Sequence, residues 1–214
     1  MSTILRARAL AFDMDGTLID SRPAIEALWL GWAKRRNLDG PAILHTAHGR
    51  PGAATVAEFE PGVDAAAEWD GLMRQAAEMR EGIAAIRGAR ETLTRLPADR
   101  WALVTASERV LATRWLAVAG LPFPPLFIGA EDVGAGKPDP EGFLRAAERM
   151  GVRPGELLVF EDSLNGARAA RAAGARLVAI NAPPEARRIA DAAADDFAAV
   201  AIDLVDDALV VTVA

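Results

Sequence analysis

The sequence predicts an α/β fold in which a Rossmann-like core of parallel strands carries an inserted small α-helical domain. Short apolar runs alternate with longer amphipathic stretches along most of the chain, which is typical of a parallel sheet covered by helices. Residues 19–87 interrupt this alternation, because they are rich in Ala, Glu, Trp, Met and Arg at helical spacing. We therefore expect a core domain at residues 1–18 and 88–214, and a helical domain at residues 19–87.

Each predicted core strand is a short apolar run bounded by polar residues, glycine or proline, as expected for strands that are buried on both faces. A further apolar run near the end of the chain, Leu209–Val213, is expected to form a final edge strand. The predicted core strands are Ala7–Phe12, Trp101–Thr105, Leu126–Ile128, Leu157–Phe160 and Leu177–Ile180.

The predicted core helices lie between these strands. Three are followed by a glycine, the residue that most readily adopts the left-handed conformation that ends many helices. We expect Asp139 to cap a helix that begins at Pro140, and Ser107 to cap the helix that begins at Glu108. The predicted helices are Ala89–Leu96, Glu108–Ala119, Pro140–Met150 and Leu164–Ala173, and the glycines are Gly120, Gly151 and Gly174.

The inserted segment contains helical patterns separated by a turn region at His48–Gly52. Its helices are predicted at Pro23–Arg36, around Ala53–Phe59 and at Ala65–Arg80. We expect the chain to cross between the domains near Ile19–Arg22 and Gly82–Gly88, and hinges of this kind are expected to move. Three tryptophans at helical spacing are expected to pack inside this domain, and His45 and His48 are expected to be ordinary residues of it; the tryptophans are Trp29, Trp32 and Trp69.

Composition excludes several classes of protein. The 214 residues include 24 Lys and Arg against 30 Asp and Glu, which argues against a general nucleic-acid binder. The sequence has no Cys, which excludes a disulfide scaffold, a thiolate metal site and a cysteine nucleophile. No apolar stretch approaches the roughly 18 residues that cross a bilayer, and the run after Arg8 is too short for a secretory signal. We expect a cytoplasmic protein with no nucleic-acid or membrane partner.

The first candidate site is Asp13-Met14-Asp15-Gly16-Thr17, which directly follows the first predicted strand. Ligands bind at the carboxyl ends of strands in open parallel sheets, and two carboxylates two residues apart can face one cleft there. The glycine permits a tight backbone turn, and carboxylate oxygens suit a hard cation. A simple Asp-Gly turn without a ligand is the alternative for this segment alone.

Three later segments place further polar groups after predicted strands. Thr105 precedes a helix N-terminus, where backbone N–H groups favour an anion such as phosphate. Lys137 lies between a glycine and a proline, in a stiff loop that would aim its ammonium group. Glu161 and Asp162 would add a second acidic element to the cleft, although adjacent acids also favour a helix N-terminus. The order acid pair, hydroxyl, lysine, acid pair is more specific than any single segment.

This ordered set resembles the motifs of the haloacid dehalogenase-like (HAD) hydrolase superfamily, over essentially the whole chain. Asp13-x-Asp15-Gly-Thr is similar to the first motif of that family, Thr105 to the second, Lys137 to the third and Glu161-Asp162 to the fourth. The helical insertion after the first motif lies where the family places its mobile α-helical cap. The resemblance therefore implies a Rossmann-like core with an inserted cap domain.

Within the family, three segments are most similar to the sugar and polyol phosphatases, such as the 2-deoxyglucose-6-phosphate, glycerol-phosphate and bacterial hexitol phosphatases. His48-Gly49-Arg50 and the tail that begins at Asn181 also resemble the bacterial branch. The resemblance implies a Mg²⁺-dependent phosphatase whose partner is a small phosphorylated sugar or polyol. The three segments are Trp101–Ser107, Gly136–Pro140 and Val159–Asp162.

The resemblance also implies a role for each acidic residue. Asp13 would be the nucleophile and would form an aspartyl-phosphate. Asp15 would protonate the leaving alcohol and then deprotonate the hydrolytic water. The Asp13 carboxylate, the backbone carbonyl of Asp15 and the Asp162 carboxylate would hold Mg²⁺, with Glu161 close to or within its shell.

A second group of residues would hold the substrate. The resemblance implies that Thr105, the Ala106 N–H and Lys137 grip the transferring phosphoryl group, which needs positioning and charge neutralisation. Gly49 and Arg50 are the candidate substrate contacts in the cap.

Other functions remain open at this point. Dehalogenases of the superfamily lack the second acid of the first motif, so Asp15 argues against that chemistry. A β-phosphoglucomutase-like enzyme would share all four motifs but would need a second phosphate grip in the cap, for which Arg50 is the candidate. A catalytically idle binding or regulatory member normally lacks Asp13, Asp15 or Lys137, and all three are present. We expect a monomer, since a small cap that opens and closes needs no partner.

Overall fold

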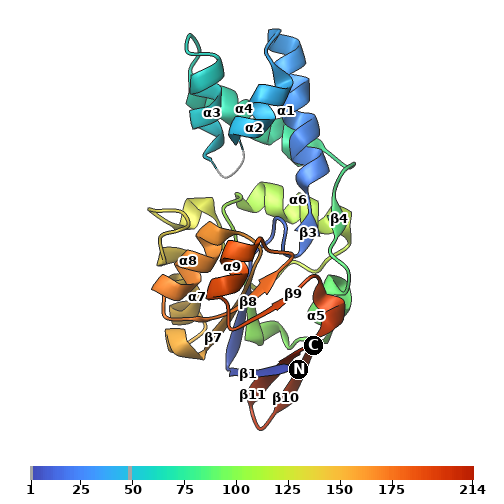
Figure 1. Cartoon of the computed structure of the whole chain (residues 1–214), viewed down its shortest axis with the longest axis vertical. Coiled ribbons are helices and arrows are strands. Elements are labelled where there is room, and N and C mark those ends of the chain that lie inside the picture. The colour runs from blue at the N-terminus through green and yellow to red at the C-terminus, as the bar shows by residue number, and fades with distance from the viewer. Residues whose placement is uncertain (1, 48–49) are drawn as a thin grey trace. The chain divides into compact units, whose positions relative to one another are not determined.

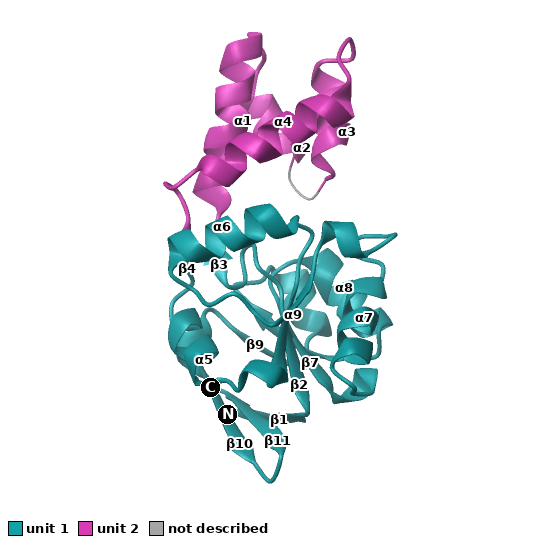
Figure 2. Ribbon diagram, turned by 180° about the vertical axis from the view of Figure 1, so that it is seen from behind, with its two compact units in different colours: residues 1–20, 84–214 teal, residues 21–83 magenta. Residues whose placement is uncertain are grey.

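The computed structural model of the chain, shown in Figure 1, describes residues 2–47 and 50–214. The chain divides into two compact units, one formed by Met1–Asp20 with Ala84–Ala214 and the other by Ser21–Ile83 (Figure 2). Residues 19, 20 and 84–87 fall in the first unit, whereas the sequence analysis placed them in the helical domain. The short strands β3 (Ile19–Asp20) and β4 (Ala84–Ala85) pair antiparallel. They lie where the chain leaves the first unit and where it returns to it.

A six-stranded parallel sheet forms the centre of the first unit, with strand order β6-β5-β2-β7-β8-β9. The predicted α/β fold with a parallel sheet is thereby confirmed. The first acidic motif follows β2, which lies between β5 and β7, so the carboxyl ends of these three strands are neighbours. The strands are β2 (Ala9–Phe12), β5 (Trp101–Val104), β6 (Leu126–Ile128), β7 (Leu157–Glu161), β8 (Arg176–Ile180) and β9 (Ala192–Ala194).

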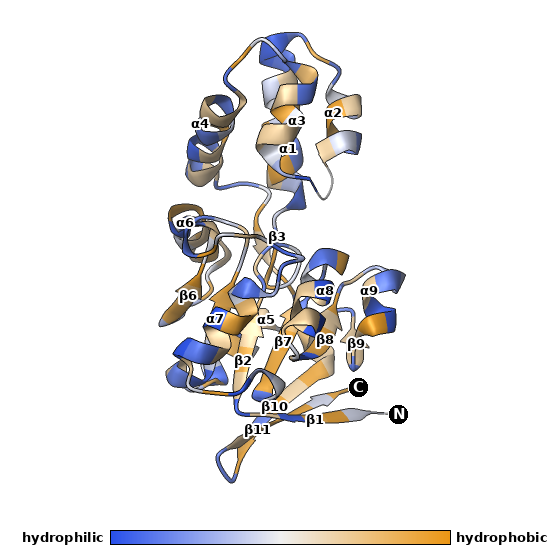
Figure 3. Cartoon of the chain, turned by 90° about the vertical axis from the view of Figure 1, so that its left-hand side faces the viewer, coloured by the Kyte–Doolittle hydropathy of each residue, from blue (hydrophilic) through white to orange (hydrophobic). Residues whose placement is uncertain are grey.

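Helices pack against this sheet, and in Figure 3 its strands are mostly hydrophobic whereas the helices carry hydrophilic stretches. Three of them supply small buried residues to an alanine-rich core on one face. Gly120, Gly151 and Gly174 have φ angles of 67°, 66° and 78°, which confirms the predicted left-handed helix ends. The helices are α5 (Ala89–Arg95), α6 (Arg109–Ala119), α7 (Glu141–Arg149), α8 (Leu164–Ala172) and α9 (Pro184–Ile189), with 3-10 turns at Ala98–Arg100, Ala130–Asp132, Pro154–Glu156 and Phe197–Ala199.

Large aromatic side chains fill the other face of the sheet. Phe12 of β2 and Phe160 of β7 are paired in register and their rings stack at 4.7 Å. Phe197 packs against both rings, and Trp101 meets Phe12 edge to face at 5.9 Å. Because Phe12 and Phe160 each lie one residue before an acidic site residue, this packing fixes the strand ends that carry the site.

A second sheet corrects two predictions of the sequence analysis. The expected single strand Ala7–Phe12 is in fact two, because the chain bends at Arg8 between β1 (Thr3–Ala7) and β2. The apolar tail is not an edge strand, because β11 (Ala208–Val213) lies between β1 and β10 (Val200–Val205) in a three-stranded antiparallel sheet. The alternating burial of β11 is typical of a sheet with one covered face.

The second unit consists of four helices in the part of it that the structure describes. Trp29 stacks on Trp69 and contacts Trp32, which confirms that the tryptophans pack inside this unit. Helix α2 was not predicted, and His48 lies outside the described residues. The helices are α1 (Arg22–Arg36), α2 (Gly40–Ala47), α3 (Gly52–Phe59) and α4 (Ala65–Glu78). Among the described helices of the whole chain, none combines the length and apolar character that a membrane span requires.

The aromatic packing next to the site leads to a stability prediction. Phe160 is fully buried, so Phe160→Ala is expected to lower the free energy of unfolding by about 3–5 kcal/mol through lost burial and a cavity. Chemical denaturation measures this change. Phe123→Ala is the control, because Phe123 is 36% exposed and its loss is expected to cost about 1 kcal/mol or less. An equal cost for the two substitutions would contradict this view of the core.

Candidate active site

The first acidic motif forms a tight turn directly after β2. The backbone N–H of Ile19 donates to the Met14 carbonyl at 3.0 Å, and the Gly16 N–H donates to the Ile19 carbonyl at 2.8 Å. Gly16 has a φ angle of 88°, and a Cβ at this position would lie 2.0 Å from Oδ2 of Asp162. Only glycine therefore permits both the turn and the close approach of Asp162 to the motif.

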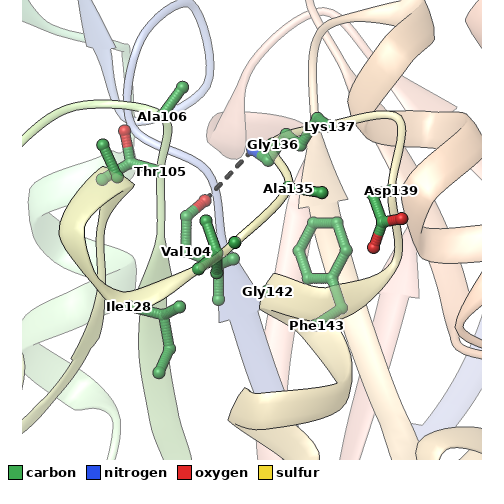
Figure 4. A pocket seen from close by; sticks show the side chains of 13 residues that line it. Val104, Thr105, Ala106, Ile128, Ala135, Gly136, Lys137, Asp139, Gly142 and Phe143 are labelled. Carbon is green, nitrogen blue, oxygen red and sulfur yellow. Dashed lines mark hydrogen bonds between the residues drawn. The ribbon is translucent and has the colours of Figure 1, made fainter.

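A single ammonium group ties three neighbouring strands together at their carboxyl ends. Lys137 Nζ donates to Asp13 Oδ1 at 2.5 Å, to Glu161 Oε1 at 2.6 Å and to the Val104 carbonyl at 3.1 Å. Figure 4 shows the bond to Val104. Asp13 and Glu161 are only 6% and 1% exposed, so these are charge-assisted hydrogen bonds in a largely buried cluster.

The Glu161 carboxylate is held on both oxygens. Oε1 accepts from Lys137, and Oε2 accepts from the backbone N–H and the hydroxyl of Ser163 at 2.7 and 2.9 Å. The Ser163 hydroxyl in turn accepts from the Gly166 N–H at 3.0 Å and caps α8. A Cβ at Gly166 would lie 1.7 Å from Glu161 Oε1, so this glycine makes room for the carboxylate.

The electrostatics of the cluster favour a cation. Carboxylate oxygens of Asp13, Glu161 and Asp162 lie within 4.8 Å of one another. Burial and the neighbouring carboxylates raise the pKa of Asp13 well above its usual value and raise the pKa of Asp162 to about 7. Burial opposes the charged form of Lys137, but the charges of Asp13 and Glu161 outweigh it and raise the pKa of this lysine. One ammonium cannot balance three carboxylates, and hard oxygen ligands suit a divalent cation.

Ser107 contacts the first motif, and its predicted role as a helix cap is wrong. Helix α6 begins at Arg109 after Glu108, and its first N–H donates to Glu131 Oε1 at 2.9 Å rather than to the Ser107 hydroxyl. The Ser107 hydroxyl donates instead to Asp15 Oδ2 at 3.0 Å, and its backbone N–H donates to the hydroxyl of Thr105 at 3.1 Å. The hydroxyl thus donates to a carboxylate instead of accepting from a helix N–H, and Ser107 joins the second motif to the first.

The three residues predicted to grip a phosphoryl group line one cavity of about 260 Å³ (Figure 4). Thr105 and Ala106 border it from the end of β5, and Lys137 borders it from the loop before α7. Its inner wall is apolar and includes Val104 and Phe143.

The comparison with known families decides the identity of this arrangement. The model of the haloacid dehalogenase-like hydrolases matches residues 7–174, which include all four motifs. The chain is a haloacid dehalogenase-like hydrolase. This confirms the family that the ordered motifs predicted.

Relatives of this HAD hydrolase include named phosphatases. It is 37% identical to hexitol phosphatase A of Escherichia coli, over 86% of this chain and 88% of the relative. It is 32% identical to glycerol-1-phosphate phosphohydrolase 2 of Saccharomyces cerevisiae, over 82% of this chain and 75% of the relative. A HAD family hydrolase from Deinococcus radiodurans, solved with bound phosphate and sodium, is 30% identical with a TM-score of 0.65, over 87% of this chain and 90% of that one.

The two substrate contacts predicted for the cap, Gly49 and Arg50, stay a prediction. Arg50 lies in the second unit, where its guanidinium pairs with Glu58 at 2.7 Å. Gly49 lies outside the described residues. Sequence reasoning also overlooked Ser163 and Gly166, which hold Glu161. A serine and a glycine at the start of a helix are too common to single them out.

The space that Gly166 leaves for Glu161 leads to a second stability prediction. Gly166→Ala places a methyl group against a fixed, buried carboxylate and is expected to cost about 1–3 kcal/mol, although alanine is the better helix former. Gly155→Ala is the control, because its Cβ meets only the Gly174 carbonyl at 3.8 Å, and its effect is expected within about 0.5 kcal/mol. Denaturation of both variants tests this, and a Gly166→Ala variant as stable as the parent would contradict it.

Proposed function

We propose that this hydrolase cleaves small sugar or polyol phosphate monoesters in a Mg²⁺-dependent reaction through an aspartyl-phosphate. The observation that carries the proposal is the Lys137 ammonium beside the Asp13 carboxylate, together with the cavity that Lys137 and Thr105 both line. A nucleophilic carboxylate and a positioned cation are the groups that phosphoryl transfer needs. The names of the relatives, a hexitol phosphatase and a glycerol-1-phosphate phosphohydrolase, support the substrate class.

The acidic residues fit a divalent cation. We assign the carboxylates of Asp13 and Asp162 and the backbone carbonyl of Asp15 as its protein ligands. Glu161 was a further candidate, but Lys137 and Ser163 already occupy its oxygens, so we assign it to holding Lys137. When bound, Mg²⁺ would offset the negative charge of the phosphoryl group, which otherwise opposes entry into a carboxylate-rich site.

The residues of the chain would perform two displacements at phosphorus. In the first, an Asp13 oxygen bonds to phosphorus, the bond from phosphorus to the ester oxygen breaks, and Asp15 donates a proton to the leaving alcohol. In the second, Asp15 takes a proton from a water molecule, whose oxygen attacks phosphorus and releases inorganic phosphate from Asp13. Lys137, Thr105 and the Ala106 N–H hold the non-bridging oxygens in both steps.

The alternative functions are less well supported. A phosphosugar mutase would need a second phosphate grip in the cap, and the candidate, Arg50, would first have to leave its exposed pair with Glu58. A purely regulatory role would not explain the buried charge cluster, whose desolvation costs folding free energy.

The helical domain, predicted at residues 19–87, is proposed to act as the cap over the substrate.

Substrate class and metal dependence form the first prediction from this proposal. Phosphate release is expected from hexitol phosphates and glycerol 1-phosphate in the presence of Mg²⁺, to be lost after chelation by EDTA, and to return when Mg²⁺ is added back. A colorimetric phosphate assay across a panel of esters measures this. Full activity in the chelated enzyme would contradict the metal requirement, and isomerised sugar phosphate without released phosphate would favour a mutase.

The nucleophile provides the second prediction. Asp13→Asn removes the attacking carboxylate while keeping its shape, so kcat is expected to fall about a thousandfold or more. The matched control is Asp203→Asn on the exposed strand β10, which should hydrolyse the same esters at the parental rate. Circular dichroism checks that both variants fold. Substantial turnover by a folded Asp13→Asn variant would rule out the covalent route.

A further inference from the structure

The loop that carries Lys137 has little side-chain packing of its own. Gly134, Ala135 and Gly136 precede the lysine, are exposed, and bear at most a methyl group. The same three residues border the cavity of about 260 Å³, and Figure 4 shows Ala135 and Gly136 beside it, so the loop faces empty space rather than packed core. A glycine-rich loop over a cavity needs hydrogen bonds to fix its position.

Glu141, the first residue of α7, supplies those hydrogen bonds. Its Oε2 accepts from the backbone N–H groups of Gly134 at 2.8 Å and Ala135 at 3.0 Å. Its own N–H donates to Asp139 Oδ1 at 2.9 Å, but the helix begins at Glu141 and its N-cap residue is Pro140, one position later than the predicted cap Asp139. Both sides of the Lys137 loop are thereby joined to the first turn of α7.

The carboxylate of Glu141 is itself oriented by a second residue. Arg145, one helical turn further on, donates to Oε1 through Nε at 2.8 Å and Nη2 at 2.7 Å. Oε1 therefore faces the arginine and leaves Oε2 for the loop. Hydrogen bonds from Arg145, Ala135 and Gly134 keep the pKa of Glu141 below its usual value, so the carboxylate is charged at neutral pH.

We propose that Glu141 is a positioning residue for Lys137, acting through its two hydrogen bonds to the backbone of Gly134 and Ala135. The inference rests on the proposed phosphatase function. During the reaction the Asp13 carboxylate becomes bonded to phosphorus and ceases to be the ion-pair partner seen here. Glu161 and the Val104 carbonyl still contact the ammonium group then, and Glu141 holds the backbone of the loop from which the Lys137 side chain extends.

Two variants separate the reach of this side chain from its charge. Glu141→Asp keeps the negative charge at the helix N-terminus but is one methylene too short to span to the loop. It is expected to lose about 10- to 100-fold in kcat/KM, the scale of a misplaced catalytic group. Glu141→Gln keeps the reach with a neutral acceptor and is expected to stay within about fivefold of the parent, because neutral acceptors keep roughly half the bond strength.

The control is Arg153→Ala, which removes an exposed ion pair with Glu156 and touches neither Glu141 nor the Lys137 loop; it is expected within about twofold of the parent. Thermal unfolding should be similar for all three variants. Inhibition by inorganic phosphate should weaken in Glu141→Asp alone, which a purely structural role would not produce.

Three results would overturn the inference. They are full activity in Glu141→Asp, a loss in Glu141→Gln that exceeds the loss in Glu141→Asp, or an equal loss in all three variants with lowered melting temperatures. A parent enzyme that releases no phosphate and is not bound by phosphate would overturn the proposed function and this inference together. Normal parental turnover with an unimpaired Glu141→Asp overturns the inference alone.

Discussion

The buried ammonium of Lys137 among carboxylates is the interaction on which the rest of the site depends. It contacts Asp13 after β2, Glu161 at the end of β7 and the Val104 carbonyl at the end of β5. Removing one member of such a buried pair typically costs about 3–5 kcal/mol, because the partner charge remains without compensation. One lysine can contact all three groups only because β2, β5 and β7 end side by side in the sheet. The stacked rings of Phe12 and Phe160 hold β2 and β7 in this register.

Two glycines leave the space in which charged groups of the site approach the backbone. A side chain at Gly16 would occupy the place of the Asp162 carboxylate, and one at Gly166 would occupy that of Glu161. Ser163 and Ser107 then fix Glu161 and Asp15 by hydrogen bonds. The result is a site in which the lysine and the acidic groups are already held in place by the folded chain, which would reduce the cost of reorganisation in the proposed phosphoryl transfer.

The sequence predicted the sheet and the charged residues well, because both depend on strong local patterns. Buried parallel strands are continuous apolar runs, and their carboxyl ends carry the acidic pairs and Thr105. The strand prediction was wrong at Arg8, where a bend divides one apolar run between two sheets. It was also wrong at the tail, where β11 is the middle strand of the three-stranded sheet and not an edge strand. Tertiary partners decide both cases, and neither partner is adjacent in sequence.

The supporting residues were harder to predict than the charged ones for a related reason. Ser107 has the sequence context of a helix cap, and only the folded chain brings the Asp15 carboxylate within its reach. Glu141 reads as an ordinary acidic residue in the first turn of a helix, where it suits the helix dipole. Its contacts with Gly134 and Ala135 depend on the path of the loop, which glycines leave undetermined in the sequence.

Trapping of the covalent intermediate tests the central claim most directly. The enzyme is mixed with a hexitol phosphate and Mg²⁺, quenched in acid within one turnover and reduced with borohydride, which converts an aspartyl-phosphate into homoserine. Peptide mass spectrometry then locates the change. The account predicts homoserine at position 13, and at no other aspartate. Turnover at the normal rate with an unmodified Asp13 would contradict it.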